Sequence, residues 1–317
     1  MNGMHFGVSV FPQYTTWDAM RSTGLRVEEL GYDSLWTWDH FLPIFGDPTG
    51  PNLEGWQVLA AWGATTSRVK LGALVSGNTY RHPAVLANMA ATLDHITSGR
   101  AIVGLGAAWY EREHVQYGIP FETAGHRLAR MDEAAQVLRS LLDQSVTTFE
   151  GKHYQLKDAY CEPKPLQTRL PLMIGGGGER KTLRTVARYA DQWNGFGTPQ
   201  EVAHKLEVLR GHCADVGRDP AEILSTVLLR VVIRDSQAEV DRQAEAIART
   251  NRISTPPSTG VGTLSGTPQE ISDVIVAYYR AGVRGVLLGL FAPYDLETLD
   301  RFASQVKPRV LEAIAEG

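Results

Sequence analysis

The sequence predicts a closed (β/α)8 TIM barrel, and three observations carry that prediction. Short apolar runs alternate with helix-length amphipathic segments along the 317 residues. The alternation gives eight strands and at least eight helices, the pattern of a closed barrel. No Gly-x-Gly-x-x-Gly fingerprint follows the first strand, which argues against an open doubly wound sheet. We expect one domain over residues 1–317, with insertions after the fourth and seventh strands.

The first two strand–helix units occupy the N-terminal part of the chain. Residues 5–10 alternate in polarity and are partly β-branched, which predicts the first strand. A helix over 16–30 leads through a glycine turn into a second strand at 34–38. Apolar residues within 56–68 then predict the second helix.

A strand–helix–strand unit over residues 71–105 is the clearest part of the pattern. Its two apolar runs, 71–75 and 101–105, flank one helix-length segment, so we expect the strands to be parallel. Spacings of four, four and three predict one apolar helix face, made of Val85, Met89, Leu93 and Ile96. Both runs end in small residues, where a flat ligand can approach the backbone closely: Ser76, Gly77, Gly106, Ala107 and Ala108.

The connection over residues 107–170 is too long for an ordinary loop, so we interpret it as an insertion beside the site. Apolar residues at spacings of three and four predict a helix between 128 and 142. A hairpin is expected to follow, with strands at 146–149 and 153–156 around a Glu-Gly-Lys turn.

Strands and helices then alternate again to the end of the chain. We expect the remaining strands at 171–174, 191–194, 223–233 and 285–290. We expect the remaining helices directly after the glycine run at 175–178 and at 199–216, 237–249, 268–281 and 296–316. The segment 251–266 is rich in Ser, Thr, Pro and Gly, which predicts a second, flexible insertion.

Composition narrows the class of protein. A net charge of −4 supplies no basic field for nucleic acid or an anionic membrane. Cys161 and Cys213 lie far apart and lack metal-ligand spacing, as expected for a reduced cytoplasmic chain. No apolar run reaches membrane-spanning length, and the first residues lead straight into a strand, so we expect a soluble protein without a targeting segment. No pair of histidines has metal-ligand spacing with a nearby carboxylate, so we expect no metal site.

Four consecutive glycines, Gly175 to Gly178, precede Glu179 between a predicted strand and a predicted helix. Such a run lets several backbone N–H groups point at one anion, and the helix start adds partial positive charge. A phosphate is the anion that suits this arrangement. The run lacks Gly-Lys-Ser/Thr, so it is no Walker loop. The alternative is a tight turn, which would need only one or two glycines.

His40 follows the second strand, at the barrel face where enzymes of this fold keep their chemistry. An imidazole there can donate a hydrogen bond or exchange a proton near neutral pH. The alternative is a histidine that holds a loop. Asp39 either orients His40 or caps the loop, and we favour the loop role.

Other candidate residues have structural interpretations. We expect His82, at a helix entry, and His95, near a helix end, to be structural. Glu111 and Glu113 are expected to be solvated first-turn carboxylates. Three tryptophans near strand ends suit either core packing or contact with a planar ligand: Trp36, Trp38 and Trp109.

Three ordered segments carry a more specific signal. They are SLWTWDHF, LGALVSGNTYRHPAVLANMAATLDHITSGRAIVGLGAAWYEREHVQYGIPF and LMIGGGGERKTLRTVARYADQWN. Together they resemble the bacterial luciferase-like family, and more narrowly its branch that uses the deazaflavin coenzyme F420. The resemblance runs from the first strand to about Trp193 and returns in TPQEISDVIVAYYRAGVRGVLL.

The resemblance implies a (β/α)8 barrel with the cofactor ring at its C-terminal mouth and His40 beside the reactive part of the ring. Ala73-Leu74 falls where deazaflavin members carry a cis non-prolyl bulge behind the ring. The implied cofactor-binding residues are Asp39, His40, Ala73, Leu74, Ser76, Asn78, Gly106, Ala107, Ala108, Gly175, Gly176, Gly177, Gly178 and Glu179, with the glycine run and Glu179 receiving the cofactor phosphate.

The resemblance also bears on the substrate. Trp109, which we expect to contact substrate, stands where the glucose-6-phosphate dehydrogenase branch has a catalytic glutamate. Thr198 stands where that branch has a lysine for the sugar phosphate. These two departures argue against a sugar phosphate as the substrate.

The leading hypothesis is an F420-dependent oxidoreductase that exchanges a hydride with a small organic substrate, with His40 as the catalytic residue. The first alternative is a monooxygenase that uses flavin mononucleotide (FMN) on the same barrel. The second is a non-catalytic flavin-binding relative. Family resemblance also implies a homodimer that pairs through outer helices.

Overall fold

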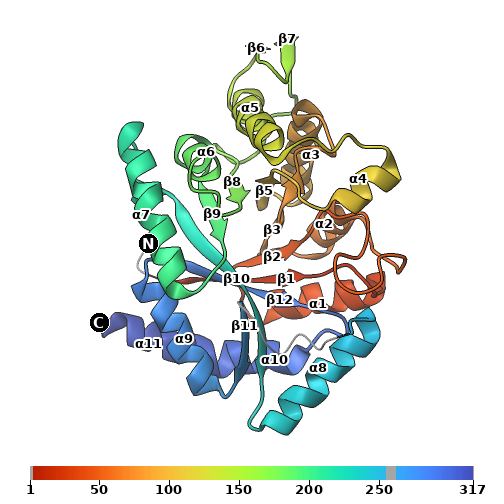
Figure 1. Ribbon diagram of the computed structural model, residues 1–317, viewed down its shortest axis with the longest axis vertical. Helices are drawn as coiled ribbons and strands as arrows, with labels where there is room; N and C mark the ends of the chain where they lie inside the picture. Colours follow the sequence, from red (N-terminus) through yellow and green to blue (C-terminus); the bar gives the residue numbers. More distant parts are fainter. Residues whose placement is uncertain (1–2, 255–261, 317) are drawn as a thin grey trace.

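Parallel strands form a closed barrel at the centre of the molecule (Figure 1). The computed structural model describes residues 3–254 and 262–316. Around the barrel the order is β1, β2, β3, β5, β8, β9, β10 and β12, and β12 pairs with β1 again. Their bounds are His5–Val10, Ser34–Thr37, Lys70–Ala73, Ala101–Gly106, Leu172–Gly175, Gln192–Gly195, Leu224–Ile233 and Gly285–Leu290. The predicted fold class and its eight strands are confirmed.

Helices surround the strands and cover the outside of the barrel (Figure 1). Their bounds are α1 Trp17–Glu29, α2 Gly55–Thr65, α3 Pro83–Ile96, α4 Glu111–Tyr117, α5 Ala124–Asp143, α6 Thr182–Tyr189, α7 Pro199–Asp215, α8 Gln237–Asn251, α9 Pro268–Arg280, α10 Leu296–Arg301 and α11 Lys307–Ala315, with a 3-10 turn at Pro220–Glu222. Threonine side chains cap several of the helix starts. Thr198 and Thr267 each form a reciprocal capping box, with Glu201 and Glu270.

The barrel strands are apolar on both faces, which explains why they appear in the sequence as short continuous runs. Every residue of β5 and β12 is buried. One face of such a strand packs inside the barrel and the other packs under the helices, so neither face of β5 or β12 meets water.

The predicted insertion after the fourth barrel strand is present. It contains α4, α5 and an antiparallel hairpin of β6 (Thr147–Glu150) and β7 (Gln155–Ala159). The Glu133 carboxylate on α5 accepts hydrogen bonds from three successive backbone N–H groups at the hairpin turn, those of Lys152, His153 and Tyr154. The hairpin is therefore fastened to α5 and forms a sheet separate from the barrel.

The third strand differs from its prediction. It ends at Ala73, and a two-residue strand, β4 (Ser76–Gly77), continues its edge by pairing with β5. Between the two strands the Leu74–Val75 peptide bond is cis. The resemblance put such a bond at Ala73–Leu74, one residue too early.

The segment 251–266 was predicted as a flexible insertion, and its last part is a strand. Thr263–Gly266 forms β11, which pairs in parallel with β10 on the side away from β12. Its sequence, TLSG, has one large apolar residue, so no apolar run marks it. Residues 255–261 of the predicted insertion lie outside the described residues.

The last helix was predicted as one piece, but the structure divides it. A π-helical segment, Phe302–Val306, joins α10 to α11. Pro308 has no N–H to donate to the carbonyl four residues earlier, and that missing bond favours the wider turn.

The helix expected between 83 and 96 is present, but its predicted apolar face is wrong in part. Val85 is 53% exposed and Ile96 is 41% exposed. The buried face carries mainly small residues, which a search for large apolar side chains overlooks: Leu86, Ala87, Ala90, Ala91 and Leu93.

Close packing between β3 and β5 predicts the effect of one substitution. A Cβ atom at Gly104 would lie 1.8 Å from the Ala73 carbonyl oxygen, and that oxygen belongs to the backbone and cannot rotate away. Gly104→Ala should therefore lower the free energy of unfolding by at least about 2 kcal/mol, measured by urea denaturation.

Gly211 on α7 provides the matched control. It is exposed, and a Cβ there meets no atom within 4 Å. Gly211→Ala should leave stability unchanged or raise it by up to about 1 kcal/mol. If the free energy of unfolding falls equally in Gly104→Ala and Gly211→Ala, the proposed packing constraint at Gly104 is contradicted.

Candidate functional site

A cavity of about 430 Å³ opens where the barrel strands reach their carboxyl ends. The ends of β5, β8 and β9, the loops that follow β2, β3, β4, β5, β8 and β9, the middle of β10, and residues of β4, α5 and α6 supply its wall. The lining residues are His40, Leu74, Val75, Gly77, Tyr80, Gly106, Ala107, Ala108, Trp109, Leu128, Gly175, Gly176, Gly177, Thr182, Asn194, Phe196 and Leu228. Most of these residues are apolar or small, so the cavity suits a flat organic molecule that polar groups hold at a few points.

A buried carboxylate holds His40 in place. The Nδ1 atom of His40 lies 2.7 Å from Oε1 of Glu113, which is fully buried on α4. The other Glu113 oxygen accepts the Phe41 backbone N–H at 2.9 Å, and the Tyr80 hydroxyl also donates to Glu113. Burial alone would raise the pKa of Glu113, but these hydrogen bonds outweigh it and the pKa is lowered.

The charged form of Glu113 fixes the role of the imidazole. An ionised carboxylate only accepts hydrogen bonds, so Nδ1 of His40 carries a proton. Nε2 is then the ring nitrogen that is left to face the cavity. The arrangement can donate or accept a proton there and can stabilise positive charge on the ring.

The prediction that Glu113 is solvated is wrong, whereas Glu111 is exposed as expected. The helix α4 has seven residues and buries Glu113 and His114, neither of which is apolar. No apolar stripe could therefore show which side of α4 faces inward. This carboxylate lies four residues beyond Trp109, at a position to which the sequence prediction assigned no function.

Asp39 lies behind the cavity wall. Its Oδ2 atom is 2.5 Å from Nη1 of Arg81, and the same guanidinium reaches Glu54 at 2.8 Å. Burial raises the pKa of Asp39 to about 6, although Arg81 acts in the opposite direction. Asp39 and Glu54 lie near the two ends of the loop between β2 and α2, and Arg81 lies in the loop between β4 and α3. The Asp39–Arg81–Glu54 group therefore ties these two loops together, which agrees with the favoured loop role.

The structure brings nine of the predicted site residues to the cavity wall: His40, Leu74, Gly106, Ala107, Ala108, Trp109, Gly175, Gly176 and Gly177. Six others do not line it: Asp39, Ala73, Ser76, Asn78, Gly178 and Glu179. Ala73 packs in the core, and Ser76 accepts the Trp56 indole N–H at 3.0 Å. Glu179 is exposed and lies 3.3 Å from the His204 ring.

Asn78 is also buried behind the wall, where its backbone N–H donates to the Gly106 carbonyl at 2.9 Å.

Several residues that line the cavity were not predicted as site residues. They include Tyr80, Leu128, Thr182, Asn194, Phe196 and Leu228. They are ordinary apolar or polar residues whose positions only the folded barrel brings together.

The glycine run lies between the cavity and a lysine. It begins at the end of β8, and the helix α6 starts at Thr182. A Cβ at Gly175 would lie 3.1 Å from both Val75 methyl groups, and one at Gly177 would lie 2.9 Å from Nζ of Lys205. Only glycine leaves this space open. The space, the start of α6 and the Lys205 ammonium together can hold an anion.

Of the three tryptophans, one belongs to the cavity. Trp36 is fully buried in the core, and Trp38 stacks on Phe11 with ring centroids 4.6 Å apart. Trp109 is 60% exposed and its ring lies 5.6 Å from that of His40. Its position is compatible with the predicted contact to a substrate.

His82 and His95 have the structural roles expected of them. The His82 ring accepts the Ala84 N–H at the start of α3, and the His95 ring bonds the Lys164 carbonyl. Across residues 3–254 and 262–316, no three His, Cys, Asp or Glu side chains are grouped as metal ligands. In the same ranges, no helix has the length and hydropathy that crossing a bilayer requires.

The family model for luciferase-like monooxygenases matches residues 4–262. The chain belongs to that family. The closed parallel barrel agrees with this membership. The fold is similar to that of a solved F420-dependent secondary alcohol dehydrogenase. The two have a TM-score of 0.84 and 21% identity over 97% of this chain and 99% of that one. At this identity the likeness shows the fold alone.

Relatives of this luciferase-like chain have different activities. It is 33% identical to the F420-dependent glucose-6-phosphate dehydrogenase of Kineococcus radiotolerans over 68% of this chain and 64% of that protein. It is 29% identical to the pyrimidine monooxygenase RutA of Methylorubrum extorquens over 94% of this chain and 88% of that protein. The chain thus spans less than two thirds of the length of the dehydrogenase and of several other curated relatives. The family is one of oxidoreductases, and membership leaves the choice of cofactor open.

The buried position of Asp39 predicts a dependence of stability on pH. Folding raises its pKa from 3.8 to about 6, so the folded chain holds this proton more tightly than the unfolded chain does. The contribution of Asp39 to stability is therefore largest below about pH 4 and falls as pH rises through about 6. Relative to Asp39→Asn, the wild-type free energy of unfolding should fall by about 2–3 kcal/mol between about pH 4 and pH 7.

Urea unfolding of both proteins at several pH values measures this change. The variant also loses the ion pair with Arg81, which changes its free energy of unfolding by a constant amount. The diagnostic quantity is therefore how the wild-type free energy of unfolding minus that of the variant changes with pH. If this difference stays constant or increases as pH rises, the raised pKa of Asp39 is contradicted.

Proposed function

We propose that this chain is an F420-dependent oxidoreductase that transfers a hydride between the deazaflavin and a small organic substrate. The observation that carries the proposal is His40, held by the buried Glu113 carboxylate at the wall of an apolar cavity in the barrel mouth. The F420-dependent glucose-6-phosphate dehydrogenase, to which the chain is 33% identical, supports the cofactor assignment.

The residues present fit a flat cofactor with an anionic tail. Gly106, Ala107 and Gly175 leave space that larger side chains would fill, and the Leu74–Val75 peptide forms part of the same wall. The glycine run with the start of α6 would hold the phosphate. When bound, F420 supplies the hydride chemistry.

The protein would position the reacting groups, exclude water from them and control one proton at His40. The apolar wall around His40 keeps water from the reacting atoms, and Glu113 keeps the imidazole in one orientation. Nε2 of His40 is the atom that would polarise the substrate or exchange a proton with it. Trp109 would cover the substrate from the outer side of the mouth.

Two alternatives remain for the same cavity. A monooxygenase that uses FMN is favoured by the alignment with RutA, which spans most of this chain. A non-catalytic flavin-binding protein would keep the cavity and lack turnover. We also propose a homodimer, on family resemblance, and a location in the cytoplasm, on the two free cysteines Cys161 and Cys213.

The cofactor proposal predicts the outcome of a binding titration. Purified protein should bind F420 more tightly than FMN, and the bound chromophore should absorb near the violet–blue edge without the two bands of a flavin. Gly177→Val should weaken F420 binding at least about tenfold, because its side chain would fill the space beside Lys205.

Gly211→Val is the control, since it introduces the same side chain on the exposed face of α7. Preference for FMN would favour the monooxygenase alternative. If Gly177→Val binds F420 as tightly as wild type does, the phosphate lies elsewhere.

The proposed role of His40 predicts that its removal lowers the hydride-transfer rate more than the affinity for F420. His40→Ala should slow hydride transfer at saturating cofactor by about 10²–10⁴-fold, the usual range for a positioned acid–base group. Its affinity for F420 should fall less, because the glycine run would hold the phosphate independently. Single-turnover absorbance changes of bound F420, followed with short-chain alcohols or ketones, measure the rate.

The control is His95→Ala, which removes an exposed imidazole that does not line the cavity. It should leave the hydride-transfer rate and the affinity for F420 unchanged. If the affinity of His40→Ala collapses while its rate at saturation stays near wild type, His40 is a binding residue. If no substrate of this kind turns over in the wild-type protein, the non-catalytic alternative gains support.

A further inference from the structure

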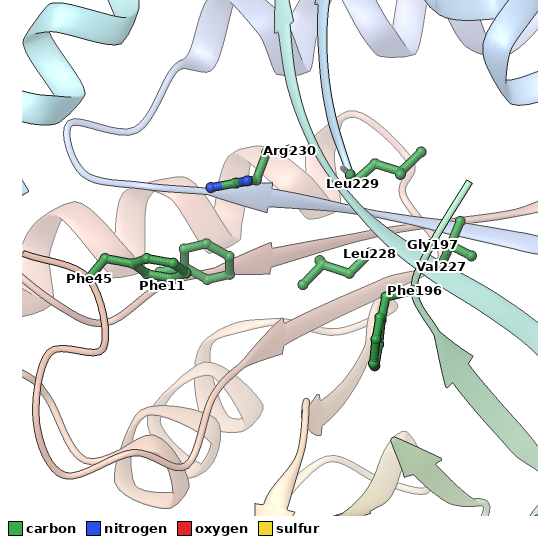
Figure 2. Close-up of a pocket in the computed structure, with 9 residues that line it drawn as sticks. Phe11, Phe45, Phe196, Gly197, Val227, Leu228, Leu229 and Arg230 are labelled. Carbon is green, nitrogen blue, oxygen red and sulfur yellow. The ribbon is translucent and has the colours of Figure 1, made fainter. Parts of the chain in front are cut away.

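A second cavity of about 280 Å³ adjoins the first (Figure 2). The two share Phe196 and Leu228 in their walls, so they are neighbours. We call the second cavity the aromatic chamber. Its lining residues are Phe11, Phe45, Phe196, Gly197, Val227, Leu228, Leu229, Arg230 and Gly262.

The walls of the aromatic chamber are mostly apolar and closely packed around Phe11. Phe11 is packed between Trp38 and Phe291, with ring centroids 4.6 and 4.9 Å away. Gly289 on β12 keeps the space open on one side. A Cβ atom there would lie 2.9 Å from Cζ of Phe11 and 3.5 Å from Cγ of Arg230. Such walls favour a flat or branched hydrocarbon body.

Among the described residues that line the aromatic chamber, Arg230 is the one with a charged side chain. It projects from β10 on the same side as Leu228, toward Phe11 and Phe45, whereas Leu229 points the other way (Figure 2). Its backbone N–H donates to the Gly262 carbonyl at 2.7 Å, which fixes the strand at this point.

The guanidinium of Arg230 has no protein counter-ion in the part of the chain that the structure describes. Arg234, four residues along, pairs with Asp295 at 3.0 Å, and Arg252 pairs with Asp47 at 2.9 Å. Burial lowers the pKa of Arg230, and no neighbouring carboxylate opposes that effect. A half-buried cation without a partner is costly, and an anionic ligand would remove that cost.

We propose that the aromatic chamber binds a substrate that carries one carboxylate on an apolar or aromatic body, with Arg230 as its counter-ion. The inference rests on the proposed function only in calling this molecule the substrate. One guanidinium presents two parallel N–H groups, which match one carboxylate. A phosphate would need further donors, and the remaining lining residues are glycines and hydrocarbon or aromatic side chains.

The shared wall gives the bound molecule a direction. With its carboxylate at Arg230, the body extends past Leu228 and Phe196 toward the cavity that contains His40. The reacting carbon would then lie at the end of the molecule distant from the acid group.

The test compares a carboxylate with its neutral amide. We expect wild-type protein without cofactor to bind 3-phenylpropanoate at least about tenfold more tightly than 3-phenylpropanamide in calorimetric titrations. Arg230→Met should bring the two affinities within about twofold by weakening the carboxylate alone. Arg230→Gln is a second variant that keeps a polar side chain and should behave in the same way.

Arg284→Met is the matched control, because Arg284 is exposed at the opposite end of β12 and its guanidinium already bonds Tyr279 and Val283 carbonyls. It should keep the wild-type preference. Equal binding of acid and amide, no saturable binding of the acid, or a preference that survives both Arg230 variants would overturn the proposal. Because the titration omits cofactor, its result is independent of whether the chain uses F420.

Discussion

The Glu113 carboxylate is the interaction on which the geometry of the mouth depends. It accepts hydrogen bonds from the loop after β2, through His40 and Phe41, and from Tyr80 after β4. Its own helix, α4, follows β5. One buried charge thus joins loops from three neighbouring strands, and each donor stabilises it against the cost of burial. The barrel supplies the positions of the strand ends, and this carboxylate fixes how the loops above them meet.

The two cavities divide the polar groups of the mouth between them. The cavity at His40 has the glycine run and the start of α6 at one end, whereas the aromatic chamber has the lone guanidinium of Arg230 at its far side. Phe196 and Leu228 line both cavities, and their hydrocarbon side chains offer no hydrogen bonds. Polar recognition at the two outer ends and apolar contact in the middle would orient a cofactor and a substrate toward each other, with His40 as the polar group beside the reacting atoms.

Much of the fold could be predicted because barrel strands are buried on both faces and so appear as apolar runs, as in β5 and β12. The prediction failed where burial does not follow large apolar side chains. The buried face of α3 is built largely from alanines, β11 is TLSG, and α4 buries Glu113 and His114. At the site, the sequence indicated residues adjacent to strand ends, such as His40 and Gly175. It could not indicate partners such as Tyr80 and Leu228, which depend on how distant strands are arranged in the closed barrel.

Trp109 has a consequence for how the molecule can be observed. The chain has seven tryptophans, and five of the other six are buried: Trp36, Trp38, Trp56, Trp62 and Trp193. Trp109 is largely in water and stands at the rim of the cavity. The chain therefore carries an exposed intrinsic fluorophore at the entrance to its cavity, whose emission reports the polarity of the mouth.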